Sequence, residues 1–177
     1  MLPALRAWSD GQKRSELTQS ALVVSNWIRQ DFLRSSPDSA QADDKGMLTL
    51  DCAIKKRESH ESEFSEQVIY WREGRNIRRA SQNKVVNDPD FLTATLEDLA
   101  GFDSVRRLSA HVAPDELDSE GQTRSSYEIQ IGANTPWRAT LYLKLQKEDR
   151  VAEIQTSFSS IYAPFDAKFV ETDNSLR

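Results

Sequence analysis

The chain has little cysteine and glycine, and it has no long hydrophobic run. Its 177 residues include one cysteine, Cys52, which excludes an intramolecular disulfide framework and a cysteine-rich zinc site. The six glycines form no G-x-G or G-x-x-x-x-G-K pattern, so the usual phosphate-binding loops are excluded. The longest strictly apolar runs are four residues, such as Ala21–Val24, which is too short to span a bilayer.

An excess of basic charge is also missing. The chain carries 23 Lys and Arg against 28 Asp and Glu, a net charge of −5, and the basic residues are scattered. This distribution argues against a nucleic-acid-binding face, so we expect no nucleic acid partner. No arrangement of residues resembles an active site, and we expect neither catalysis nor a cofactor. The length fits one soluble globular domain that can bury its own core.

The N-terminal part of the chain predicts one long helix over residues 2–34. Pro3 stands near its start, and Ser35, Ser36 and Pro37 end it. At about 100° per residue, the apolar residues of its second half fall in a stripe roughly 80° wide. We expect this stripe to pack on a sheet; it contains Leu17, Ala21, Val24, Ile28 and Phe32. Leu5 and Trp8 lie on another side of the helix.

Alternating apolar residues predict about six or seven antiparallel strands after the helix. The predicted strands cover 47–54, 67–72, 75–81, 104–112, 127–131, 139–145 and 152–158, with a tight turn at Glu73-Gly74 and a short helix between Asp88 and Gly101. The fold class is therefore α+β, a long N-terminal helix packed on an antiparallel β-sheet. The expected parts are residues 1–36 for the helix, 37–160 for the sheet domain and 161–177 for a C-terminal strand or tail.

The candidate metal ligands are weak. Glu116, Asp118 and Glu120 precede a glycine, as in the first half of a calcium loop, but the twelfth position is Tyr127 instead of glutamate. We therefore expect an acidic surface turn and no bound metal. His60 stands among carboxylates in a highly charged segment that is typical of a solvated loop.

Three further side chains have structural interpretations. Cys52 alternates with Leu50 and Ile54, which favours a buried small hydrophobe over a reactive thiol. His111 is expected to point outward without an evident partner. Trp27 lies off the helix stripe and is expected to be exposed or to touch a loop.

Several segments share a pattern with one known family. They are Leu2–Arg6, the amphipathic stretch Ser20–Arg34, the hairpin Val68–Arg79 with its Tyr-Trp-Arg-Glu-Gly-Arg-Asn-Ile-Arg-Arg sequence, and the late strand Thr135–Leu141 that opens near a proline. Together they resemble type IV pilin-like proteins over nearly the whole chain. More narrowly, the chain is similar to the J-like minor pseudopilins of type II secretion and to the minor pilins of type IV pili.

The resemblance implies a filament subunit. The partners would be other pilin-like or pseudopilin subunits, contacted through Leu5 and Trp8. Residues 1–36 would be the membrane-proximal and amphipathic part of the family's N-terminal helix, whose leader and transmembrane segment this sequence lacks. The implied location is the bacterial inner membrane, single-pass, with this domain in the periplasm or outside the cell. The alternative is a soluble ligand-binding module with a pocket between helix and sheet.

Overall fold

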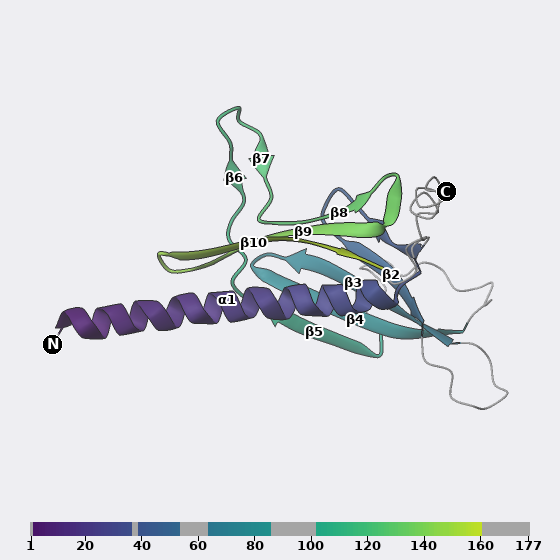
Figure 1. Cartoon of the computed structure of the whole chain (residues 1–177), viewed down its shortest axis with the longest axis horizontal. Helices are drawn as coiled ribbons and strands as arrows, with labels where there is room; N and C mark the ends of the chain where they lie inside the picture. The colour runs from purple at the N-terminus through teal and green to yellow at the C-terminus, as the bar shows by residue number, and fades with distance from the viewer. Residues whose placement is uncertain (1, 37–38, 54–63, 86–101, 161–177) are drawn as a thin grey trace, which may run out of the picture.

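In a computed structural model, residues 2–36, 39–53, 64–85 and 102–160 are described. They form one helix and ten strands: α1 (Leu2–Arg34), β1 (Gln41–Ala42), β2 (Leu48–Ala53), β3 (Phe64–Glu73), β4 (Asn76–Val85), β5 (Ser104–Ser109), β6 (Glu116–Leu117), β7 (Thr123–Arg124), β8 (Tyr127–Gly132), β9 (Thr135–Lys147) and β10 (Arg150–Ser159). The layout is α+β, with the N-terminal helix packed on antiparallel sheets (Figure 1).

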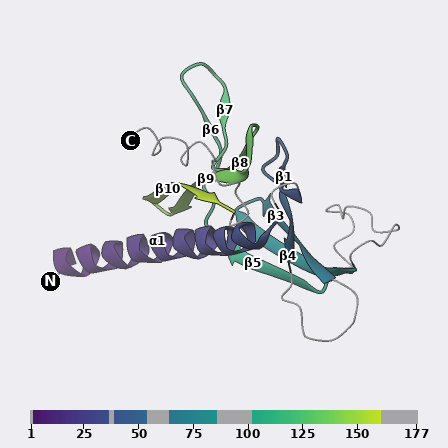
Figure 2. The same ribbon diagram turned by 45° about the vertical axis from the view of Figure 1, so that its right-hand side comes forward.

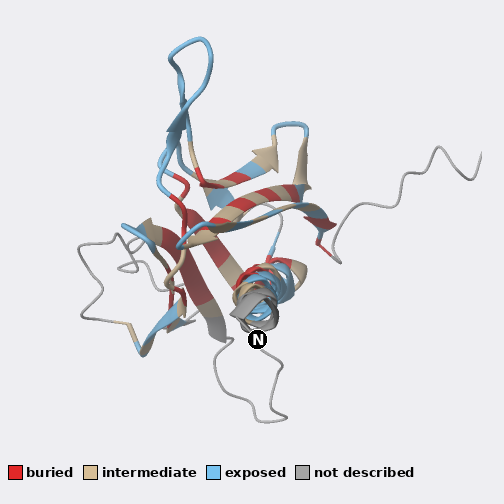
Figure 3. Ribbon diagram, turned by 90° about the vertical axis from the view of Figure 1, so that its left-hand side faces the viewer, coloured by how far each residue is buried: buried red, intermediate tan, exposed pale blue. Residues whose placement is uncertain are grey.

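The strands form three sheets within the described residues. The orders are β1-β2-β3-β4-β5, β10-β9-β8 and the two-stranded ribbon β6-β7. The prediction of one sheet with six or seven strands is therefore wrong. Alternation of apolar residues shows which face of a strand is buried, but it does not show which strands share hydrogen bonds. Viewed along the helix, the two larger sheets diverge and α1 occupies the angle between them (Figure 3).

The helix is continuous through Gly11, although glycine in a helix interior costs about 1 kcal/mol relative to alanine. It ends where Ser35 turns back on the last turn: its backbone N–H and its Oγ both donate to the carbonyl of Phe32, at 3.2 and 2.9 Å. Ser35 also forms a β-bridge with Cys52. The C-terminal end of α1 is thereby fixed to the edge of β2.

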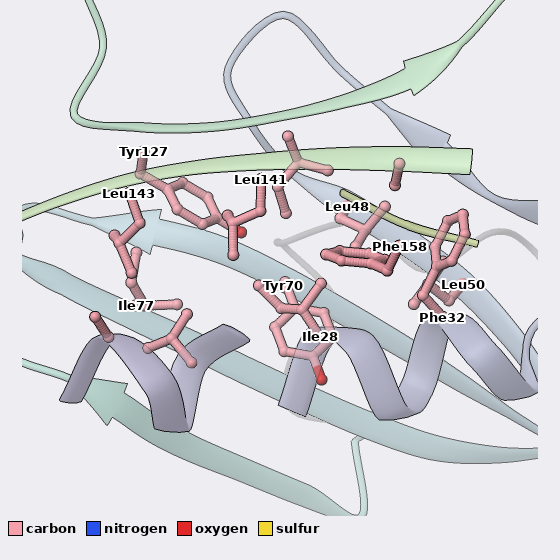
Figure 4. Close-up of a cluster of buried hydrophobic side chains, with 14 of the residues drawn as sticks. Ile28, Phe32, Leu48, Leu50, Tyr70, Ile77, Tyr127, Leu141, Leu143 and Phe158 are labelled. Carbon is pink, nitrogen blue, oxygen red and sulfur yellow. The ribbon is translucent and has the colours of Figure 1, made fainter. Parts of the chain in front are cut away.

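The core lies where α1 meets both sheets. The five stripe residues Leu17, Ala21, Val24, Ile28 and Phe32 have no exposed surface. They belong to one cluster with residues of β2, β3, β4, β8, β9 and β10, part of which Figure 4 shows. The rings of Phe32 and Phe158 meet edge to face with centroids 5.3 Å apart. Because each fully buried aliphatic side chain contributes about 1.5–3 kcal/mol, this stripe is the main attachment of the helix.

Two local predictions need correction, and one lies outside the described residues. Glu73 pairs with Asn76, so the β3–β4 turn is Gly74-Arg75 and not Glu73-Gly74; Gly74 takes the left-handed backbone with φ of 58°. The acidic segment with Glu116, Asp118 and Glu120 is expected to be a surface turn only, whereas in the structure its turn joins two short strands, β6 and β7 (Figure 2). The helix predicted between Asp88 and Gly101 falls in the part that is not described.

Candidate assembly interface

A buried ionic network orients the helix on the larger sheet. Asp31 of α1 and Arg79 of β4 are 1% and 5% exposed. The Arg79 Nε donates to Asp31 Oδ2 at 2.7 Å, and the hydroxyl of Tyr70 donates to the same oxygen. Burial alone would lower the pKa of Arg79, but the hydrogen bond to Asp31, the charge of Asp31 and the contact with Tyr70 together outweigh burial and raise the pKa. An ion pair that is this specific in geometry sets one rotation of the helix about its axis.

Two more charges complete the network. Glu66 accepts from Arg79 Nη2 at 3.2 Å and from Arg34 Nη2 at 3.3 Å, and Arg34 also pairs with Asp31. Two guanidinium groups therefore meet two carboxylates, and the charges balance. Burial raises the pKa of the Tyr70 phenol, and the charge of Asp31 raises it further, so this hydroxyl stays a hydrogen-bond donor.

Trp27 and Cys52 border the same network. The guanidinium carbons of Arg79 and Arg106 lie 5.1 and 5.8 Å from the Trp27 ring centroid, so the expectation of an exposed or loop-contacting Trp27 is wrong. Cys52 is buried, and its Sγ donates to the Asp31 carbonyl at 3.3 Å. Burial raises the pKa of this thiol to about 12, which removes it from thiolate chemistry at neutral pH.

The opposite side of α1 presents an uncharged surface to solvent. We call it the outer strip, and its exposed residues are Gln12, Ser15, Gln19, Leu22, Val23, Asn26 and Gln30. Leu22 is 52% and Val23 44% exposed, which is unusual for neighbouring large aliphatic residues. By helical spacing, Leu5 and Trp8 continue the strip toward the N-terminus; their side chains lie outside the described part.

The N-terminal end of α1 projects beyond the sheets, and the turns that follow it lie beside the β9–β10 hairpin (Figure 1). Ion pairs connect its inner side to the β9–β10 turn: Asp10 with Arg150, Lys13 with Glu148, and Glu16 with Lys147 at 2.6 Å. Glu16 also lies 3.5 Å from Nε2 of His111, a partner that was not evident from the sequence. Asp10, Lys13 and Glu16 therefore face the protein, and the uncharged strip faces away.

The acidic candidates lie on the protruding ribbon β6-β7. Asp118 Oδ1 accepts from the backbone N–H groups of Glu120 and Gln122, at 2.9 and 2.8 Å, while Glu116 pairs with Lys144 at 2.7 Å. These carboxylates stabilise a turn and an ion pair. Within the residues that the structure describes, no group of three or more His, Cys, Asp or Glu side chains is placed to hold a metal ion. His60 is outside those residues.

A groove of about 1070 Å³ runs between the β1–β2 turn, strand β8 and the base of the β6-β7 ribbon. Its walls are mainly polar and include Asp44, Lys45 and Glu128. Core side chains fill the space between the apolar stripe of α1 and the sheets (Figure 4). A smaller hollow of about 400 Å³ lies between α1, at Arg29 and Leu33, and residues 156–159 of β10. The groove is therefore not the helix-on-sheet pocket of the alternative hypothesis.

Sequence reasoning did not identify Asp31, Arg79 or the part of the outer strip beyond Leu5 and Trp8. Asp31 stands three residues after Ile28, beside the apolar stripe, and Arg79 alternates with Ile77 on β4. The available signal for both residues was a charge at a position that the apolar periodicity assigns to the interior.

The α1 helix, the one described helix, is not long and apolar enough to cross a membrane. Comparisons with protein-family models, curated proteins and solved structures find no match.

Proposed function

We propose that this protein is a non-catalytic subunit of a pilus or pseudopilus filament, a minor pseudopilin or minor pilin of the type IV pilin-like family. It would act in type II secretion or type IV pilus assembly. Its partners are other pilin-like subunits, and its mechanism is subunit packing. The sequence resemblance described above is the origin of this proposal.

The observation that carries the proposal is the outer strip. It runs along a helix that is longer than the sheets require, it has no charge, and it exposes Leu22 and Val23. Charged residues of the N-terminal half, such as Lys13 and Glu16, instead contact the β9–β10 turn. A surface of this kind suits packing against another helix, because close helix packing requires side chains without a large desolvation cost. Helices bundled inside a filament supply such a neighbour.

The buried ionic network fits the same role. Because Asp31 and Arg79 fix the rotation of α1, the outer strip always points away from the sheets. A filament subunit needs this constancy, since every copy must present one helix face at one angle to its globular domain.

The proposal places the domain in the periplasm or outside the cell, with the protein held in the inner membrane by a segment that precedes this sequence. We expect the product of the intact native gene to fractionate with the inner membrane. Protease added to spheroplasts should digest the domain. Recovery of the intact protein from the cytosol would contradict the proposal and favour a soluble binding module.

Introducing charged side chains into the outer strip tests its role in subunit packing. In the intact native protein, Leu22→Lys together with Val23→Lys should abolish co-purification with pilin-like subunits, because two ammonium groups cannot be buried between helices. The matched control is Val151→Lys, since Val151 is 47% exposed on β10, away from the strip. Equal co-purification of both variants would remove the support that the outer strip gives to this function.

A further inference from the structure

The ribbon β6-β7 stands away from the rest of the molecule (Figures 1 and 3). Leu117 on it is 73% exposed, more than the other exposed large hydrophobic residues of the described chain. Glu116, Asp118 and Glu120 surround this leucine with negative charge. The ribbon adds nothing to either hydrophobic cluster, so its apolar side chain has no role inside its own domain.

The ribbon is nevertheless held in a defined position. At its base, Asp115 pairs with Arg72 and accepts from the Ser126 backbone N–H at 2.8 Å. The Arg124 guanidinium carbon lies 4.8 Å from the ring centroid of Tyr142. At its tip, Asp118 organises the turn through the hydrogen bonds given above. A fixed ribbon loses little conformational entropy when it binds, which favours a role in recognition.

The backbone N–H and C=O of Leu117 are also available for hydrogen bonds. The Asp118 N–H donates to the Gln122 carbonyl at 2.9 Å, so the backbone of Asp118 faces β7. Alternate residues of an antiparallel strand face opposite sides, so the N–H and C=O of Leu117 face away from β7. No described residue bonds to them. The free edge of β6 can therefore accept another strand.

The opposite side of the molecule carries a complementary edge. Strand β5 is the last strand of the larger sheet, and its Val105, Arg106 and Arg107 are exposed. Val105 is 45% exposed and pairs in register with Ala80, which pairs with Ile69, so it ends an apolar row across the outer face of that sheet. Within the described chain, Arg107 has no ion-pair partner.

We propose that the β6-β7 ribbon of one copy adds to the β5 edge of a second copy. Leu117 continues the Ile69–Ala80–Val105 row, and the ribbon carboxylates lie beside Arg106 and Arg107. Main-chain hydrogen bonds along the two free edges supply the register. Because the two surfaces differ and lie on opposite sides, the contact is heterologous and produces open chains of copies. Such a chain of copies extends perpendicular to α1, and the contact between copies requires neither the membrane nor the outer strip.

Disulfide trapping between two purified single variants tests the contact. In a Cys52→Ala background, Leu117→Cys protein is mixed with Val105→Cys protein under mild oxidation. We expect this mixture to form a dimer about tenfold faster than Leu117→Cys mixed with Val151→Cys, because docking raises the local thiol concentration. Val151 is the matched control, being a similarly exposed valine on the edge strand β10. Melting curves establish that each variant is folded.

Charge reversal provides the second arm. Glu116→Lys in the Leu117→Cys protein, or Arg106→Glu in the Val105→Cys protein, should slow the trapping. When both proteins carry their changes, the trapping rate should recover. About 0.5 M salt should slow disulfide trapping between the proteins that keep Glu116 and Arg106, since salt screens exposed charge pairs. Equal rates at Val105 and Val151, or faster trapping of Val105→Cys with itself, would overturn the proposal. Neither result would bear on the outer strip, so failure here is distinct from failure of the filament proposal.

Discussion

At the scale of single residues, the attachment of the helix combines apolar burial with one buried ionic network. Burial of Ile28 and Phe32 supplies the free energy of transfer from water, and the ion pair of Asp31 with Arg79 sets the rotation of the helix about its axis. The two kinds of contact respond differently to substitution. An apolar side chain that is lost leaves a cavity, whereas a lost charge leaves its partner buried and unpaired.

The first prediction concerns that partner. Asp31→Leu should lower the free energy of unfolding by about 3–5 kcal/mol, because the buried Arg79 then keeps only the partly exposed Glu66 as an ion-pair partner and the Tyr70 hydroxyl loses its acceptor. The double variant Asp31→Leu with Arg79→Met should recover most of the loss. Urea unfolding followed by circular dichroism measures both, with Gln30→Leu on the exposed side of the same helix as control. Simple additivity of the two single changes would contradict the network.

The second prediction concerns alkaline pH. The pKa of Cys52 rises from 9.0 to about 12 on folding because the thiol is buried. The folded state then holds a proton that the unfolded chain has released, so stability should fall as pH rises from about 9 toward about 12. Urea unfolding at pH 8 and at pH 10.5 should show a loss of about 2 kcal/mol from this group. In Cys52→Ala the decline should be shallower, and an unchanged slope would show that the thiol titrates normally.

Residue by residue, the apolar interior was predictable and the polar interior was not. The spacing of Leu17, Val24 and Ile28 identifies a buried stripe because hydrophobic burial follows helical period. Asp31 and Arg79 are buried only because they meet each other, and that meeting depends on the pairing of strands far along the chain. The sequence shows that Asp31 stands at an interior position of the helix, but it does not show which distant residue pairs with it.

At the scale of elements, the two halves of α1 are held differently. The second half is fixed by core side chains, whereas the half that includes Asp10, Lys13 and Glu16 is held by surface ion pairs. Exposed ion pairs contribute little to stability and are screened by salt. The N-terminal half is therefore attached weakly, which leaves it available for a partner.

The third prediction follows from this difference. Asp10→Asn, Lys13→Gln and Glu16→Gln combined should leave the melting temperature almost unchanged. Amide hydrogen exchange over residues 9–16 should become faster, while exchange over residues 24–32 stays slow. High salt on the unmodified protein should act in the same direction. A large drop in melting temperature would show that these pairs carry the fold.

Element boundaries were predictable where the local chemistry is strong. The predicted helix over residues 2–34 matches α1, because Ser-Ser-Pro is a strong stop signal in the sequence and Ser35 turns back on the last turn of the helix. The turn between β3 and β4 was displaced by one residue, since either side of Gly74 can supply the second turn position. The division into separate sheets was missed because it depends on long-range pairing.

At the scale of the whole molecule, one surface is distinguished by its lack of charge in a strongly charged chain. The outer strip lies on a projecting helix whose rotation is fixed from inside. We expect it to be covered in the cell by the helices of other pilin-like subunits. The alternative of a soluble ligand-binding module assigns no partner to this surface.

The most direct test is photo-crosslinking in the living cell. A benzoylphenylalanine is placed at Val23 in the intact native gene product, with a second protein carrying it at Val151 as control. We expect ultraviolet-dependent crosslinks from position 23 to proteins whose own sequences begin with a pilin-like apolar segment, and none of these crosslinks from position 151. Crosslinks from position 23 that match those from position 151, in a protein found free in the cytosol, would contradict it.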